Sequence, residues 1–470
     1  MTVRKSLQEL LSPAELFETS GAQVAFTGSD PVFPTPYLVG TAGAAVLGAV
    51  GLAASDLWFL RTGRTQGVQV DVRAAAAAMR SARYLTIHGK PPKELWDPLS
   101  GYYPVQDDRW VSIHCNFPNH RDAAMGVLGI SDNCAASRAA AEEASRHWDG
   151  LALEEAIHAA QGCAGLARSA VEWAQHPHSA AVAAQPLLEI RKIGEAAPQP
   201  LPQGTRPLSG VRVLDLTRVL AGPTCARTLA EHGADVLKIS GAHLPDSGVS
   251  EFDTGLGKLS AHLDLRAPAG IDRLRELLRE ADVFSQSYRP GALAARGFSA
   301  EQAAELRPGI VYVTLSAWGT EGPWRDRRGF DTVVQTVSGM AMAQGAWFSP
   351  PKPKLMPVSA IDYVSGYLMA FGAMVALARR AREGGSWLVR VSLARTGKWI
   401  VDRGFLEGFS VVQNPEVKDL LVKTKSSIGE IEHLKPVLQL SETMPYWERP
   451  PVPLGTHPAQ WPKRSSIEVA

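Results

Sequence analysis

The sequence lacks the features that mark several classes of protein. Four cysteines in 470 residues are too few and too scattered for a disulfide framework. The formal net charge of +1 gives no global basic field, so nucleic acid is not expected as a partner, and any anion site must come from local groups. The first twelve residues carry charges and lack the apolar run of a signal peptide. We therefore expect a cytoplasmic protein.

Long apolar runs are also scarce. The most apolar stretch, residues 38–54, is dominated by alanine and glycine and is soon followed by Asp56. It is marginal in length for a membrane span, so we expect a buried helix and no membrane partner. His114, Cys115 and His120 lie close together in the sequence, but their spacing does not match a zinc site, and no metal is expected.

The sequence changes character at residues 196–207. This stretch holds four prolines and a glycine, which cannot continue a helix or a central strand, so it is predicted to be a linker. Beyond it, apolar strands alternate with helices; the strands are expected at 211–216, 234–239, 282–285 and 310–315, and the helices at 224–232, 271–280 and 300–306. This alternation predicts an α/β fold with an open, doubly wound, Rossmann-like parallel sheet. Residues 91–195 mix shorter segments and are predicted to form a smaller α+β domain.

The chain also shows a weak internal repeat. An apolar helix at 40–60, a turn at 61–67 and a strand at 68–72 are expected, and the same order recurs at 362–382, 383–386 and 388–393. Placing residues 68–72 on 389–393 gives an offset of 321 residues. Helix, turn and strand often follow one another in this order, so duplication and coincidence both stay open at this level.

Several motifs after the linker resemble family III CoA-transferases, the group that includes formyl-CoA transferase and carnitine CoA-transferase. In the family's order they are PLSGVRVLDLTRVLAGP at 207–223, AEHGADVLKI at 230–239, LSAWGTEGP at 315–323 and GFDTVVQ at 329–335. Residues 1–90 resemble the rear half of the family's large domain instead, and residues 91–195 resemble its small domain. The resemblance therefore implies a partial copy without a nucleophile at 1–90, and a catalytic, CoA-binding large domain at 208–470.

The resemblance implies that the protein moves coenzyme A from an acyl-CoA donor to a carboxylate acceptor. The family's nucleophile is an aspartate at the start of a long apolar helix, and Asp362 takes that place here. A carboxylate that attacks a thioester forms a mixed anhydride, and the released thiolate then gives an aspartyl-CoA thioester. Backbone N–H groups at the helix N-terminus are expected to keep Asp362 ionised. The structural alternative is that Asp362 only caps the helix. In the front copy the matching position is Thr41 or Gly43, and neither offers a nucleophile.

The resemblance also suggests which residues contact CoA. Val219 and Leu220, in the turn after the first strand of the sheet, are expected to line the CoA site. Arg218 faces either a phosphate or the solvent, and Tyr288 is either a stacking surface or a packed core residue. The other expected contacts are Lys258, Ser287, Arg289 and Arg296. The CoA thioester is a substrate, and no tightly bound cofactor is expected. An interlocked homodimer is implied, although the rearranged order also allows one chain to complete the fold alone.

The sequence departs from the family's pattern at two places. Ser240 and Gly241 stand where the family often has a glutamate and a basic residue, and residues 90–98 replace a glycine-rich loop of formyl-CoA transferase. α-Methylacyl-CoA racemases share the fold but carry a Gly-His-Asp motif. Phe330 replaces that histidine here, and phenylalanine cannot carry a proton. A racemase-like isomerase and a non-catalytic CoA-binding or scaffold protein remain the alternatives.

Overall fold

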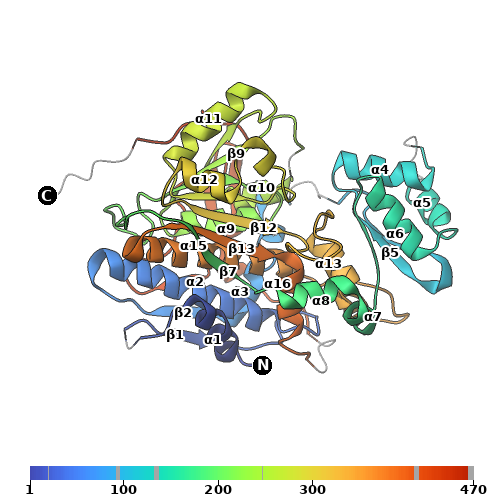
Figure 1. Ribbon diagram of the computed structural model, residues 1–470. Helices are drawn as coiled ribbons and strands as arrows, with labels where there is room; N and C mark the ends of the chain where they lie inside the picture. The colour runs from blue at the N-terminus through green and yellow to red at the C-terminus, as the bar shows by residue number, and fades with distance from the viewer. Residues whose placement is uncertain (20, 92–95, 132–136, 246, 407–411, 464–470) are drawn as a thin grey trace.

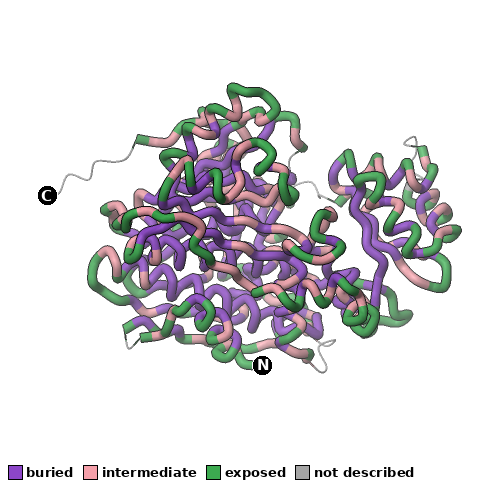
Figure 2. Tube along the Cα trace, in the orientation of Figure 1, coloured by how far each residue is buried: buried purple, intermediate pink, exposed green. Residues whose placement is uncertain are grey.

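The computed structural model describes residues 1–19, 21–91, 96–131, 137–245, 247–406 and 412–463. Figure 1 shows a large body and a smaller domain set apart on one side of it. Figure 2 shows that buried residues run through the middle of the large body, along its central sheet and the long helices beside the sheet.

A seven-stranded sheet forms the centre of the large body. Its strands lie in the order β10-β9-β8-β11-β12-β13-β7, with β7 antiparallel at one edge and the other six parallel. The bounds are β7 Glu189–Gly194, β8 Arg212–Leu216, β9 Asp235–Ser240, β10 Lys258–His262, β11 Val283–Gln286, β12 Val311–Ser316 and β13 Ser386–Ser392. The predicted α/β fold with a parallel sheet is thus confirmed. The strands β7 and β10 were not predicted, because their charged and polar residues break the apolar pattern.

A row of valines shows why these strands stay in the centre. Val213 of β8 lies beside Val236 of β9 and Val283 of β11, and Val283 lies beside Val311 of β12. All four are fully buried, as expected for a parallel sheet that is covered on both faces. The crossover helices are α9 Ala221–Glu231, α11 Pro268–Arg279 and α12 Ala300–Leu306, with the shorter α10 Val249–Thr254 between β9 and β10.

Two long apolar helices pack against each other beside the sheet (Figure 1). They are α2 (Val39–Thr62) and α15 (Ala360–Glu383), each of 24 residues. By length and composition either helix could cross a membrane, but both are mostly buried inside the protein. A helix that is apolar all round needs burial on every side, and the large body supplies it.

The predicted repeat is present in the structure. The unit of α2, β2 (Val68–Asp71) and α3 (Val72–Ala78) corresponds to the unit of α15, β13 and α16 (Leu393–Val401). The helix bounds match at an offset of 321 residues: 39 to 360, 62 to 383 and 72 to 393. The two strands lie in different sheets, since β2 pairs with β1 (Val24–Thr27) and β16 (Leu438–Leu440).

The smaller domain has its own core, built from β4, β5 and β6 with α4, α5 and α6. The bounds are β4 Gly101–Pro104, β5 Trp110–Ile113, β6 Ala164–Leu166, α4 Pro118–Leu128, α5 Ser137–Ser145 and α6 Gly150–Ala159. The end of the range predicted for this domain differs, because β7 is an edge strand of the main sheet. Shorter elements complete the fold: α1 Val3–Ala14, β3 Thr86–Ile87, α7 Ala170–Gln175, α8 Pro177–Ala184, α13 Asp331–Val337, α14 Met340–Gly345, β14 Leu421–Ser426 and β15 Gly429–Leu434.

Candidate active site

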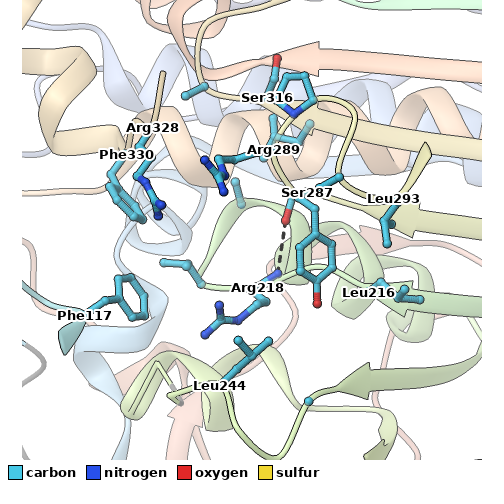
Figure 3. A pocket seen from close by; sticks show the side chains of 18 of the residues that line it. Phe117, Leu216, Arg218, Leu244, Ser287, Arg289, Leu293, Ser316, Arg328 and Phe330 are labelled. Carbon is cyan, nitrogen blue, oxygen red and sulfur yellow. Dashed lines mark hydrogen bonds between the residues drawn. The ribbon is translucent and has the colours of Figure 1, made fainter. Parts of the chain in front are cut away.

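The strand order creates a switch point between β8 and β11. From β8 the chain proceeds outward to β9 and β10, then returns to the other side of β8 and proceeds through β11, β12 and β13. The loops after β8 and β11 therefore separate, and the crevice between them is where open α/β sheets bind ligands. A cavity of about 600 Å³ lies at this point (Figure 3).

Most of the residues predicted to bind CoA line this cavity together with Asp362. They are Arg218, Val219, Leu220, Ser287, Tyr288, Arg289 and Arg296. The backbone N–H of Arg218 donates to the Ser287 hydroxyl at 3.3 Å, which joins the loop after β8 to the loop after β11 (Figure 3). Val219 has a φ of 71°, a left-handed conformation that is rare for a β-branched residue. Such strain tends to occur at functional sites.

Lys258 has a different place from the predicted one. Its side chain is buried outside the cavity, and its Nζ donates to the Asp215 carboxylate at 2.8 Å and to the carbonyl of Pro223 at 2.9 Å. Asp215 also accepts from the backbone N–H of Thr217 at 3.0 Å. Lys258 therefore bonds the residues on both sides of the turn at 217–220. It supports this turn and does not line the cavity, so the predicted direct contact with CoA is not seen.

Close packing of two helices brings Asp362 to the same turn. A Cβ atom at Gly366 would lie 2.4 Å from the carbonyl oxygen of Ala221, so only glycine allows α15 to approach the start of α9 this closely. Asp362 is one turn before Gly366, and Ala221 directly follows the turn at 217–220. Asp362 and the loop predicted to hold CoA thus line the same cavity.

Asp362 does not cap its helix. The helix α15 begins at Ala360, and Asp362 lies within its first turn. The backbone N–H of Asp362 donates to the carboxylate of Asp331 at 3.1 Å, so Asp331 does the capping from 31 residues away in the chain. Gln335 in turn donates to the Asp331 carboxylate. The structural alternative for Asp362 is therefore wrong, and its carboxylate is left at the cavity wall.

The surroundings oppose ionisation of both carboxyls. Burial raises the pKa of Asp362 well above its usual range, and the negative charge of Asp331 raises it further. Burial raises the pKa of Asp331 to about 6, although hydrogen bonds from Gln335, Asp362 and Ile361 act in the opposite direction. The expectation that the helix N-terminus keeps Asp362 ionised stays a prediction, and burial and the charge of Asp331 both act against it.

The cavity wall is strongly cationic. Among the described residues that line it, Asp362 is the single acid, and seven are arginines: Arg218, Arg266, Arg289, Arg296, Arg325, Arg327 and Arg328. Anions such as the phosphates of coenzyme A match such a wall, because arginine binds phosphate through paired hydrogen bonds.

The smaller domain supplies one side of the cavity, which the sequence did not predict. Phe117 and His120 from this domain line the cavity and meet Phe330 of the large body. The ring of Phe330 stacks on His114 with centroids 3.9 Å apart and an interplanar angle of 5°. Arg328 donates to His120 across the same boundary at 3.1 Å. A basic run next to the GFD motif, residues 325–328, was the signal available in the sequence.

The two departures from the family's pattern have different outcomes. Ser240 and Gly241 both line the cavity, beside His243 and Leu244. The stretch at 90–98 that replaces the glycine-rich loop falls partly outside the described residues, since 92–95 are not among them.

Comparison with known proteins agrees with these motifs. The sequence model of CoA-transferase family III matches residues 16–203 and 208–424. An acyl-CoA transferase of Gibberella moniliformis is 28% identical over 412 residues, which cover 79% of this chain and 72% of that protein. The succinyl-CoA:glutarate CoA-transferase of Homo sapiens is 31% identical over 40% of this chain and 44% of its own length. An acetyl-coenzyme A transferase of Hypoxylon pulicicidum is 34% identical over 42% of this chain, so the chain spans about a third of that relative.

Solved structures match the chain only in part. A CaiB/BaiF family protein from Brucella suis has a TM-score of 0.38 and 23% sequence identity, covering 48% of this chain and 65% of its own. The family model covers most of the sequence in two consecutive matches. The chain therefore belongs to CoA-transferase family III.

Proposed function

We propose that the protein transfers coenzyme A between two carboxylic acids with Asp362 as the covalent nucleophile. The observation that carries this proposal is that the Asp362 side chain does not cap its own helix. Asp331 holds the first turn of α15, so the Asp362 carboxylate is free to project at the wall of a cationic cavity. No hydrogen bond from another described residue reaches this carboxylate, whereas a purely structural aspartate in such a place would normally be hydrogen-bonded.

The proposed reaction has four steps. The Asp362 carboxylate attacks the thioester carbon of the donor, the C–S bond breaks, and the CoA thiolate leaves behind a mixed anhydride. The thiolate then attacks the aspartyl carbon, which releases the donor acid and forms an aspartyl-CoA thioester. The carboxylate of the acceptor acid attacks this thioester, the C–S bond breaks and releases the CoA thiolate, and a second mixed anhydride forms. The thiolate finally attacks the acceptor's acyl carbon, which gives the new acyl-CoA and returns Asp362.

The cavity fits both ends of the substrate. Tyr288, Arg218 and Arg296 lie at the switch point, where the nucleotide part of CoA would lie. Asp362 lies at the wall formed by the start of α15, where the thioester would lie. Relatives named for transfer among succinate, glutarate, citramalate and malate support carboxylic acids as donor and acceptor.

The stacking of Phe330 argues against racemisation. Racemisation needs acid and base groups on both sides of the α-carbon. Phe330 offers no proton, and the imidazole behind it belongs to His114, whose pKa burial lowers to about 3. His114 is also absent from the residues that line the cavity.

An acid-dependence assay distinguishes transfer from the alternatives. The protein is incubated in deuterated water with one acyl-CoA and a panel of carboxylic acids, and the CoA thioesters are identified by mass spectrometry. Transfer predicts a new acyl-CoA that appears only with its acid and matches the loss of donor. Deuterium at the α-carbon of a 2-methylacyl-CoA without any acid would instead show an isomerase. CoA binding without turnover for every pair would show a scaffold protein.

A further inference from the structure

Four of the seven cavity arginines form no ion pair with a carboxylate among the described residues. Arg266, Arg325 and Arg327 form ion pairs with Asp264, Asp326 and Glu155 at 2.8, 3.2 and 2.6 Å. No such pair with a described residue forms at the other four, which are Arg218, Arg289, Arg296 and Arg328. The cavity therefore holds positive charge that a ligand must neutralise, and the position of each arginine indicates which part of the ligand does so.

Two of these arginines lie at the nucleotide end of the cavity. Arg218 follows β8, and Arg296 ends a short helical turn at Ala294–Arg296 after β11. Both line the cavity together with Tyr288, and the guanidinium of Arg218 also lies 5.6 Å from the centre of the Phe117 ring. Phosphate groups of CoA would meet Arg218 and Arg296 there.

The other two arginines lie near each other beside Phe330. Figure 3 shows Arg328 next to Phe330, with Arg289 facing it across the cavity. Both side chains line the cavity. Residue 328 is three positions before Asp331, the carboxylate that holds the first turn of α15 at Asp362. This pair of arginines therefore belongs to the end of the cavity where the acyl group reacts.

Arg328 is oriented without being neutralised. Its guanidinium donates to Nε2 of His120 at 3.1 Å, and its own buried Nε has no partner among the described residues. Burial and three nearby arginines lower the pKa of His120 to about 4, so the imidazole is uncharged at neutral pH and accepts this hydrogen bond. Arg289 is similarly held by an amide oxygen, that of Gln161, at 3.2 Å. Both cations keep their full charge for a ligand.

We propose that Arg328, with Arg289 beside it, binds the distal carboxylate of a dicarboxylic acid whose other carboxyl group reacts at Asp362. This inference rests on the proposed transfer of CoA and adds its substrate class. The two uncharged partners, His120 and Gln161, come from the smaller domain, so that domain orients the groups that recognise the acid. Phe117 and Phe330 form apolar walls beside this subsite, against which a short methylene chain would pack.

The kinetic test compares two acyl-CoA donors that differ in one group. Succinyl-CoA and butyryl-CoA both carry four acyl carbons, and only the first has a distal carboxylate. In Arg328→Gln, kcat/KM should fall roughly 10- to 100-fold with succinyl-CoA, the usual effect of losing charge-assisted hydrogen bonds, and by less than about threefold with butyryl-CoA. Arg146→Gln removes an exposed arginine that pairs with Glu142 at 2.8 Å, and it should change neither value. Equal losses with both donors, or no loss, would overturn the inference.

A binding measurement keeps the test independent of turnover. In Asp362→Asn, which cannot form the covalent intermediate, glutarate should bind at least about tenfold more tightly than butyrate by calorimetry. Adding Arg328→Gln should abolish this preference and leave the affinity for free CoA unchanged. A matching loss of CoA affinity would assign Arg328 to a phosphate and overturn the inference. Wild-type transfer among monocarboxylates alone would overturn it too, while leaving the proposed function in place. Failure of the wild type to transfer CoA at all would reject the proposed function.

Discussion

The front and rear copies of the helix–strand–helix unit share a scaffold but differ at one position. Their long helices have equal length, lie side by side and are held at the start by an aspartate from outside the helix. Asp30 accepts from the backbone N–H groups of Gly40 and Thr41 at 3.0 and 2.7 Å. Asp331 accepts from Asp362 at 3.1 Å. At the offset of 321 residues Thr41 and Asp362 are equivalent. The backbone N–H of each is capped by an aspartate, but the side chain at this position is a hydroxyl in one copy and a carboxylate in the other.

The difference between Thr41 and Asp362 shows that the helix–strand–helix unit forms without a carboxylate at this position. Thr41 is buried, whereas Asp362 is partly exposed at the cavity that the strand order creates. The front helix begins away from this switch point, and its residues do not line the cavity. A capping aspartate is thus common to both copies, and only the rear copy adds the carboxylate that is proposed to react.

The largest expected effect comes from the equivalent positions themselves. Asp362→Asn should lower the rate of CoA transfer on the order of 10³-fold or more, because it removes the proposed nucleophile. Its melting temperature should not fall, since burial makes the charged carboxylate unfavourable in the folded state. Thr41→Ala should leave transfer unchanged and cost about 1 kcal/mol in the free energy of unfolding, through the lost hydrogen bond to Asp30. A transfer rate in Asp362→Asn close to the wild-type rate would remove the distinction between the copies.

Substituting the two capping aspartates should have a smaller effect, and the two variants should differ in the pH dependence of transfer. The proposed mechanism needs ionised Asp362, so the rate should rise with pH through a pKa above the ordinary value of about 3.9. Asp331→Asn removes the negative charge that raises this pKa, so the acidic limb of kcat/KM should move to lower pH.

Asp30→Asn provides the matched control for that shift. It should weaken the cap of α2 by about 1 kcal/mol, as Asp331→Asn does for α15, while leaving the acidic limb where it is. An identical pH profile in wild type and Asp331→Asn would show that the two carboxyls do not interact in the working enzyme.

The contrast with the least bearing on transfer concerns the ends of the two helices. Gly63 and Gly384 follow α2 and α15 with φ of 72° and 73°. A Cβ atom at Gly63 meets nothing within 4 Å, but at Gly384 it would lie 2.1 Å from the carbonyl oxygen of Ala196. Gly63→Ala should therefore cost about 1 kcal/mol from backbone strain alone, and Gly384→Ala about 3 kcal/mol. Urea unfolding measures both; equal costs would show that the linker is free to move away from α15.

The alternation of strands and helices was predictable because each parallel strand is an apolar run between turns. The helix at 300–306 agrees with α12 at both ends, since Ser299 and Gln302 form a capping box there. The strand β10 was missed because its first residue, Lys258, is charged. Its ammonium is buried against Asp215, and an ion pair between residues 43 positions apart leaves no local pattern.

Site residues were predictable only where they lie inside a motif that resembles the family. The turn at 217–220, the residues after β11 and Asp362 follow from segments that resemble the family. His120 was not predicted because its partner, Arg328, is 208 residues away in the chain and reaches it only after the smaller domain packs on the large body. The sequence also did not show that the Asp362 side chain does not cap its own helix, because the capping carboxylate comes from Asp331 in another helix.

Trapping the covalent intermediate tests the central claim most directly. The wild-type protein is incubated with an acyl-CoA, treated with hydroxylamine or borohydride, digested and analysed by peptide mass spectrometry. We expect a hydroxamate or a reduced side chain at Asp362, and none at Asp331 or in the peptide that holds Thr41. Modification of a different carboxylate, or measurable CoA transfer with Asp362 unmodified throughout, would contradict the assignment of Asp362 as the nucleophile.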